Sequence, residues 1–182
     1  MSGEAFAQLV DAHYAALYRF ALSLSRNAPD AGDLVQQTYF IWATKGHALR
    51  DAGKAKAWLF TTLYHEFLRG RRRDARSSSL EDPSVSETEL AAEDVDRAVR
   101  MDAGTAMAAL QTVDEAFRAP LTLFYLQDMS YHEIATALEV PIGTVMSRLS
   151  RGKAQLRTAL AQQEKSGLKV VPFPRAAEGG AS

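Results

Sequence analysis

The chain has 182 residues, a formal net charge of −1 and no cysteine, and 47% of its residues are hydrophobic. This length allows one domain or two small ones, and the missing cysteines exclude disulfide bonds and thiolate metal sites. Helix-forming residues dominate and alternating strand patterns are missing, so we expect an all-α protein. The polar N-terminus and the lack of a long apolar run predict no signal peptide, no membrane insertion and a cytoplasmic location.

Residues 3–75 are expected to form a first small domain of three helices. The first helix should end at Asn27-Ala28-Pro29, and Asp30 should cap the second, with Asp33 in its first turn. The third should run from about Lys54 into three consecutive arginines. The core-facing residues predicted for the three helices are Phe6, Leu9, Val10, His13, Leu17 and Phe20, then Leu34, Thr38, Ile41 and Trp42, then Trp58, Leu59, Leu63 and Phe67.

Charge is strongly segregated along the chain, although its sum is near zero. Residues 54–76 carry seven basic and two acidic side chains (+5), residues 77–100 carry two basic and seven acidic (−5), and residues 143–165 carry five basic and one acidic (+4). Two basic segments separated by an acidic one favour contact with a polyanion at two places. Residues 76–102 are therefore predicted to be a flexible acidic linker, and residues 166–182 a disordered tail.

A second small helical domain is expected over residues 103–165, with an apolar helix following Pro120. Its last part is typical of a helix-turn-helix. Ser130 and Glu133 have the spacing of a capping box, and Ile134, Ala135 and Leu138 give the next helix one apolar face. That helix should break at Glu139-Val140-Pro141, because Pro141 suits the start of a helix and not its interior.

The second helix of this motif has two faces of different chemistry. Ile142, Val145 and Leu149 should face the core, and the opposite stripe is Thr144, Ser147, Arg148 and Arg151. Hydroxyl and guanidinium groups on such a stripe suit phosphate oxygens and guanine edges. This pattern favours a DNA-reading helix over a solvated amphipathic hairpin of no special purpose.

Three segments, DAGDLVQQTYFIW, AWLFTTLYHEFLRGRRR and SYHEIATALEVPIGTVMSRLSRGKAQLR, together resemble bacterial sigma factors of the extracytoplasmic function (ECF) type, in the sigma-70 family. Those proteins contain two helical domains, sigma regions 2 and 4, joined by a flexible linker. The resemblance implies a chain that binds core RNA polymerase and directs promoter-specific transcription initiation in response to a stress or envelope signal. An anti-sigma factor is a further candidate partner.

The resemblance also assigns residues to three surfaces. The helix after Asn27 would dock on the clamp helices of the large polymerase subunit through Asp33, Gln36, Gln37 and Phe40. Region 2 would hold the minus-ten element as a melted strand, and region 4 would read the minus-thirty-five element as duplex DNA. The minus-ten residues would be His65, Arg69, Arg71, Arg72 and Arg73, and the minus-thirty-five residues Pro141, Gly143, Thr144, Met146, Ser147, Arg148, Ser150 and Arg151.

The docking helix is poorer in acids than the family pattern. Gly32 stands where an acid is common, and Gln37 stands where Glu usually follows Gln. Fewer acids predict weaker docking on a basic clamp. Phosphorylation of Thr38 or Thr44 would restore negative charge there.

Two departures lie in the DNA-binding segments. His65 replaces the usual Asn near the melted strand, and Met146 replaces a usual Lys or Arg, so both element preferences are expected to shift. Lys153 and Arg157 are expected to add non-specific, salt-sensitive attraction to DNA.

Two other functions remain open. One is a sigma-like mimic that sequesters an anti-sigma factor, which the basic character of both DNA-facing regions disfavours. The other is a dimeric helix-turn-helix regulator with a palindromic operator. Enzyme functions are disfavoured because there is no phosphate loop or nucleophile motif, so no catalytic residue, cofactor or metal site is expected. The scattered histidines are His13, His47, His65 and His132.

Overall fold

The computed structural model describes residues 3–45, 52–77 and 103–166. All regular structure in these ranges is helical, which confirms the expected all-α class. Apart from a few residues that continue the flanking helices, the segments predicted as linker and tail lie outside the described residues. No helix within the described ranges has the length and apolar character needed to cross a membrane.

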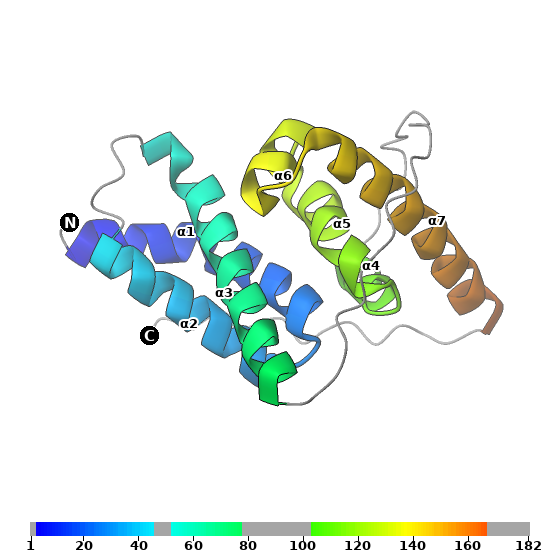
Figure 1. The fold of residues 1–182 in the computed structure, drawn as a ribbon, viewed down its shortest axis with the longest axis horizontal. Coiled ribbons are helices and arrows are strands. Elements are labelled where there is room, and N and C mark those ends of the chain that lie inside the picture. The colour runs from blue at the N-terminus through cyan, green and yellow to red at the C-terminus, as the bar shows by residue number, and fades with distance from the viewer. Residues whose placement is uncertain (1–2, 46–51, 78–102, 167–182) are drawn as a thin grey trace, which may run out of the picture.

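The first three α-helices form what we call the N-terminal group. Its elements are α1 (Gly3–Ser25), α2 (Ala28–Lys45), a short 3-10 turn η2 (Ala52–Lys54) and α3 (Ala55–Ser77). The α-helices pack against one another, and α3 crosses the middle of the molecule in Figure 1. Phe20 and Phe60 are fully buried between them, with ring centroids 5.4 Å apart. Burying one such side chain stabilises a fold by roughly 1.5–3 kcal/mol, so this pair anchors the group.

The start of α2 differs from the sequence prediction. Asn27 is the capping residue instead of Asp30, because its Oδ1 accepts a hydrogen bond from the Asp30 backbone N–H at 2.8 Å. Asp30 lies in the first turn, where its charge favours the helix dipole. Leu34 and Ile41 are only half-buried, so the inner face is rotated slightly from the predicted one. The buried residues of α2 are Ala31, Val35, Thr38, Tyr39 and Trp42.

The inner faces of α1 and α3 agree better with the prediction. Leu17 and Phe20 are buried on α1, and Leu59, Leu63 and Phe67 are buried on α3. Trp58 is half-buried and meets Trp42 edge to face, with 5.0 Å between ring centroids, so it serves packing. Helix α3 continues past its arginine run to Ser77.

The remaining helices form the C-terminal group. They are α4 (Ala103–Leu110), α5 (Glu115–Gln127), α6 (Tyr131–Leu138) and α7 (Ile142–Ser166). The prediction that an apolar helix follows Pro120 is wrong in its start, because α5 begins at Glu115 and contains Pro120. The proline lies in the second turn and removes one backbone hydrogen bond of the helix. Helix α5 packs against α4, α6 and α7, and is therefore the centre of the group.

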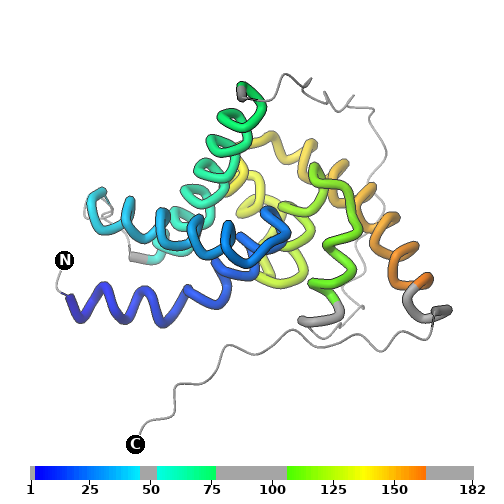
Figure 2. Tube along the Cα trace, turned by 90° about the horizontal axis from the view of Figure 1, so that it is seen from below, coloured from blue at the N-terminus to red at the C-terminus, as the bar shows by residue number. Residues whose placement is uncertain are grey.

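The two groups lie directly against each other. Helix α1 packs on α5, and α3 packs on α6. Figure 2 shows the end of α1 running in beside the green α4 and α5. Five consecutive residues of α1, Phe20 to Leu24, and eight of α5, Phe117 to Phe124, are buried on every side of their helices. Burial all round a helix requires neighbours on all sides, so each of these helices serves both groups.

Candidate functional site

The residues predicted to dock on polymerase share one exposed face of α2. Asp33, Gln36, Gln37 and Phe40 follow the i, i+3, i+4, i+7 spacing of a helix stripe, and all four are exposed. Phe40 is 63% exposed, an unusual exposure for a large apolar side chain. The opposite side of α2 is packed into the core of the N-terminal group, so this face is held rigidly. We call these four residues the α2 face.

The two threonines predicted as phosphorylation sites differ. Thr38 is fully buried, and its hydroxyl donates to the Leu34 carbonyl oxygen at 2.7 Å. Its burial confirms the core-facing position predicted for Thr38, and a hydroxyl without solvent access is not open to a kinase in this fold, so the prediction of a phosphorylation site at Thr38 is corrected. Thr44 is exposed near the end of α2 and stays a candidate. Gly32 has open space where a Cβ would stand, so the missing acid at this position is not forced by packing.

The residues predicted for the minus-ten element lie on the outer half of α3. Arg69, Arg72 and Arg73 are exposed, and Arg69 pairs with Glu66 at 3.0 Å within the helix. Two others reach across to the C-terminal group: His65 lies 3.0 Å from the Glu139 carboxylate, and Arg71 pairs with Glu115 of α5. These two basic side chains are therefore engaged by acids of the other group.

The helix-turn-helix is built as the sequence predicts. The Ser130 side chain accepts from the Glu133 backbone N–H, and the Ser130 backbone N–H donates to the Glu133 carboxylate at 2.7 Å, which completes the capping box. This backbone donor lowers the pKa of Glu133. Helix α6 ends at Leu138, and Glu139 caps it with a φ of 53°, in the left-handed region. The Pro141 carbonyl oxygen then accepts from Thr144 and Val145 as α7 begins.

The predicted recognition stripe lies on the first three turns of α7. Val145 and Leu149 are buried as predicted, but Ile142 is 37% exposed, so the prediction that it faces the core is wrong. It lies in the first turn of α7. Pro141 and Gly143 are exposed. The remaining predicted residues are half-buried: Thr144, Met146, Ser147, Arg148, Ser150 and Arg151.

Arg148 is one of these half-buried residues, and a contact with α3 accounts for its burial. Its side chain hydrogen-bonds Tyr64 of α3. Burial raises the pKa of the Tyr64 hydroxyl, although the nearby Arg148 charge opposes that shift. A residue predicted to face the minus-thirty-five element is thus held against the helix predicted to face the minus-ten element.

Lys153 does not face solvent, which corrects its expected role in non-specific attraction. It is 8% exposed, and its Nζ lies 4.9 Å from the centre of the Phe124 ring. Burial lowers the pKa of Lys153 to about 8. Arg157, one turn further along α7, is exposed as the prediction requires.

Helix α7 approaches α5 very closely at Gly152. A Cβ built there would lie 2.7 Å from Leu121 Cδ1 and 2.9 Å from Phe117 Cβ. Both distances are shorter than real Cβ contacts, so only glycine fits without movement of one helix. Gly152 therefore sets how α7 sits on the core.

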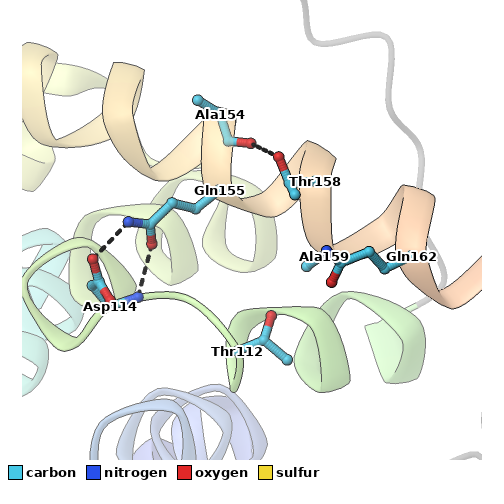
Figure 3. A pocket seen from close by; sticks show the side chains of 7 residues that line it. All are labelled: Thr112, Asp114, Ala154, Gln155, Thr158, Ala159 and Gln162. Atoms are coloured by element: carbon cyan, nitrogen blue, oxygen red, sulfur yellow. Dashed lines mark hydrogen bonds between the residues drawn. The ribbon is translucent and has the colours of Figure 1, made fainter.

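A second contact fixes α7 further along its length. The Gln155 side chain accepts from the Asp114 backbone N–H at 2.9 Å and donates to the Asp114 carboxylate at 2.6 Å (Figure 3). Beside this pair lies a shallow hollow of about 410 Å³, lined by small and polar residues. They are Thr112, Asp114, Ala154, Gln155, Thr158, Ala159 and Gln162. The residues around this hollow hold α7 in place through the Asp114–Gln155 pair, and they present neither a cluster of charge nor an apolar surface to a ligand.

Within residues 3–45, 52–77 and 103–166, no group of three or more His, Asp or Glu side chains could hold a metal ion. Of the four scattered histidines, His47 lies outside these ranges.

Sequence reasoning missed the residues that join the two groups. Gln111 Nε2 donates to the Leu22 carbonyl oxygen at 3.1 Å, and Arg118 Nη1 donates to the Ser23 carbonyl oxygen at 3.1 Å. A usable signal was present, because Leu22 falls on the side of the first helix opposite its predicted apolar stripe. Extra apolar residues on the outer side of a helix indicate a second partner.

Comparisons with known proteins agree with this architecture. The family model for sigma-70 region 2 matches residues 9–77, and the model for sigma-70 region 4 matches residues 104–156. The ECF RNA polymerase sigma factor SigE of Mycolicibacterium smegmatis is 35% identical over 159 residues, which are 85% of this chain and 61% of that protein. The chain thus spans about three fifths of that relative's length.

Two further proteins match over most of their own length. ECF RNA polymerase sigma factor SigL of Mycobacterium tuberculosis is 32% identical over 84% of this chain and 86% of that protein. The sigma factor RpoE of Bartonella quintana, crystallised in complex with the anti-sigma factor NepR, superposes with a TM-score of 0.67 and 29% identity, over 87% of this chain and 98% of that chain. The chain therefore belongs to the ECF family of sigma-70 factors.

Proposed function

We propose that this protein binds core RNA polymerase and directs it to specific promoters, acting by binding and not by catalysis, in the bacterial cytoplasm. The observation that carries the proposal is the presence in one chain of sigma regions 2 and 4, each with basic side chains at its DNA-facing helix. Two moderate affinities on one chain reinforce each other through effective concentration.

The α2 face is proposed as the surface that docks on the clamp helices. Its support is an exposed phenylalanine on a rigid helix, flanked by one acid and two amides. Buried aromatic anchors surrounded by polar residues supply most of the affinity in protein interfaces. The low acid content of this face agrees with a weaker, regulated association, for which phosphorylation at exposed Thr44 is one route.

The outer half of α3 is proposed to hold the melted minus-ten strand, and the start of α7 to read the minus-thirty-five duplex. Exposed Arg72 and Arg73 support phosphate contact on α3. The capping box and the Pro141 turn hold α7 at a set angle to α6, which supports its use as a recognition helix. The domain limits at residues 3–75 and 103–165 are part of this proposal.

An anti-sigma factor is proposed as a second partner, because the similar Bartonella quintana sigma factor was crystallised with one. This same likeness would suit a mimic that only sequesters an anti-sigma factor. A stress or envelope signal would then act by releasing the sigma factor from its inhibitor.

Transcription in vitro separates these functions. Core RNA polymerase from the source bacterium is incubated with genomic DNA fragments, with and without the purified chain, and the RNA 5′ ends are sequenced. A sigma factor should create new start sites that share two upstream elements at a fixed spacing. A mimic or a dimeric regulator would leave core polymerase without new start sites, and light scattering would then identify a dimer.

A further inference from the structure

The start of α7 carries apolar side chains on one flank and polar ones on the other. Ile142, Met146 and Ser150 follow the i, i+4, i+8 spacing of one helix face. Arg148 lies two residues after Met146, about 200° further round the helix, and there it contacts Tyr64 of α3. The side of α7 away from this contact therefore carries Ile142 and Met146, and we call this pair the apolar flank.

Solvent reaches the apolar flank, although its chemistry suits a core. Among the described residues three large apolar side chains are exposed, and Ile142, at 37%, is the only aliphatic one and the only one in the helix-turn-helix. Met146 is half-buried, but it is not one of the side chains that pack on the hydrophobic core of the described ranges. Apolar surface left in water does not stabilise the fold, so a ligand that covers this flank gains that free energy on binding.

The residues beside the apolar flank leave it open. A Cβ built at Gly143 would meet no atom within 4 Å, so the surface next to Ile142 is not filled by other elements. The Ser147 hydroxyl donates to the Thr144 carbonyl oxygen at 3.1 Å, and Arg148 is held by its contact with α3. A base that approaches the apolar flank therefore displaces neither of these hydrogen bonds.

We propose that Ile142 and Met146 select thymine in the minus-thirty-five element by packing on its C5-methyl group. This inference rests on the proposed function, because it assumes that the start of α7 lies in the major groove. Thymine is the only base that presents a methyl group there. An apolar side chain thus distinguishes thymine from the other bases, whereas a lysine or arginine at position 146 would seek acceptor atoms such as guanine O6 and N7.

Replacing thymine by uracil tests the contact, because it removes the methyl group and keeps the base pair. The upstream element is first defined from the start sites that core polymerase uses with the full chain, a complex we call the holoenzyme. Promoter duplexes then carry deoxyuridine in place of each thymidine of this element in turn. The Kd of the holoenzyme is measured by competition in the cold, before the duplex melts. Deoxyuridine at one or two positions should weaken binding about fourfold, the scale of burying one methyl group.

Substitutions assign this preference to the apolar flank. Met146→Gln keeps the length of the side chain but makes its end polar, and Ile142→Ser removes most of the other apolar surface. Both positions lie outside the core, so the fold should persist. The double variant should bind the thymidine and deoxyuridine promoters equally, whereas Met146→Leu should keep the preference. The matched control is Arg151→Ala, which should bind the promoter more weakly but still prefer thymidine about fourfold.

Equal binding of the thymidine and deoxyuridine promoters by the natural protein would overturn the inference, and so would an upstream element without thymine. A preference that persists in the double variant would also overturn it, because other residues or the shape of the DNA would then sense the methyl group. Failure of the holoenzyme to select any promoter would instead overturn the proposed function, so the two failures are distinguishable.

Discussion

The α2 face and the DNA-facing helices differ in what covers them. The four residues of the α2 face are all exposed, and none of the described contacts of the C-terminal group falls on them. Of the predicted DNA residues, His65 and Arg71 of α3 contact Glu139 and Glu115, and Arg148 of α7 contacts Tyr64 of α3, whereas the other predicted arginines of α3 are exposed. The surface proposed for polymerase is thus open, while the surfaces proposed for DNA are partly covered.

This difference bears on the order in which polymerase and DNA could be bound. The surface proposed for polymerase on α2 is accessible without any rearrangement, whereas His65 and Arg71 would have to leave their carboxylate partners to contact DNA. Substitutions on each surface can break or sharpen this contrast.

The largest effect is expected from Phe40→Ala. Removing an exposed aromatic anchor should weaken binding to core polymerase by about 2 kcal/mol or more, roughly thirtyfold in Kd. The free energy of unfolding should change by less than about 0.5 kcal/mol, because the side chain is largely in solvent. Affinity is measured by fluorescence titration of labelled chain with core enzyme.

Tyr14→Ala is the matched control, since Tyr14 is an aromatic residue of α1 that is 46% exposed and lies outside the α2 face. Its Kd should stay within twofold of the natural protein, on the scale of ordinary surface substitutions. A similar loss in both variants would mean that α2 is not a special surface.

A smaller effect is expected from Arg151→Ala on the DNA side. Loss of a base contact should weaken selected promoters by about 1–3 kcal/mol while leaving mixed-sequence DNA nearly unchanged. Arg157→Ala should weaken all sequences alike and reduce the slope of log affinity against log salt by about 1. Competition assays over a salt series measure both quantities. Uniform weakening by Arg151→Ala would remove its role in reading bases.

The smallest effect concerns the covered side of α7. Burial lowers the pKa of Lys153 to about 8, from an ordinary value of 10.5. Between these values the unfolded chain keeps a proton that the folded chain has lost, so stability should rise with pH. Below pH 8 the penalty for burying the charge is present in full. In the natural protein the free energy of unfolding should therefore rise by an amount on the order of 1 kcal/mol, and Lys153→Met should remove this rise.

Denaturant unfolding between pH 8 and pH 10 measures this rise. The upper limit avoids tyrosines such as Tyr39, whose pKa is raised to about 12 and which would oppose the trend. If the free energy of unfolding of Lys153→Met still rises over this pH range, the rise is caused by another titrating group. Gln162→Ala, at an exposed position further along the same helix, should retain the full rise.

Local signals predicted much of this molecule. The capping box at Ser130 and the break before Pro141 depend on residues within one or two turns, and both are present. The residues of the α2 face were assigned by the family resemblance, and all four are exposed. The errors arose where a distant element decides burial. Lys153 looks suited to solvent by residue type, yet it lies on the Phe124 ring. Thr38 is buried as the helix pattern predicts, and that burial contradicts the phosphorylation site proposed for the same residue.

The contact between the two groups could not be predicted from periodicity, because its partners lie far apart in sequence. Arg118 and Ser23, for example, are joined across 95 positions. What the local pattern did contain was an excess of apolar residues on α1 and α5. Such an excess shows that something covers a helix, but it does not identify the partner.

The absence of a side chain at Gly152 has a consequence for how promoter preference can evolve. Even a methyl group would press on Leu121 and Phe117 and tilt α7 away from its seat. The tilt would move all the α7 residues proposed to face bases together, although the altered atom lies on the side of α7 that contacts α5. Substitutions in the hydrophobic core could thus change promoter preference while the residues proposed to contact bases stay the same.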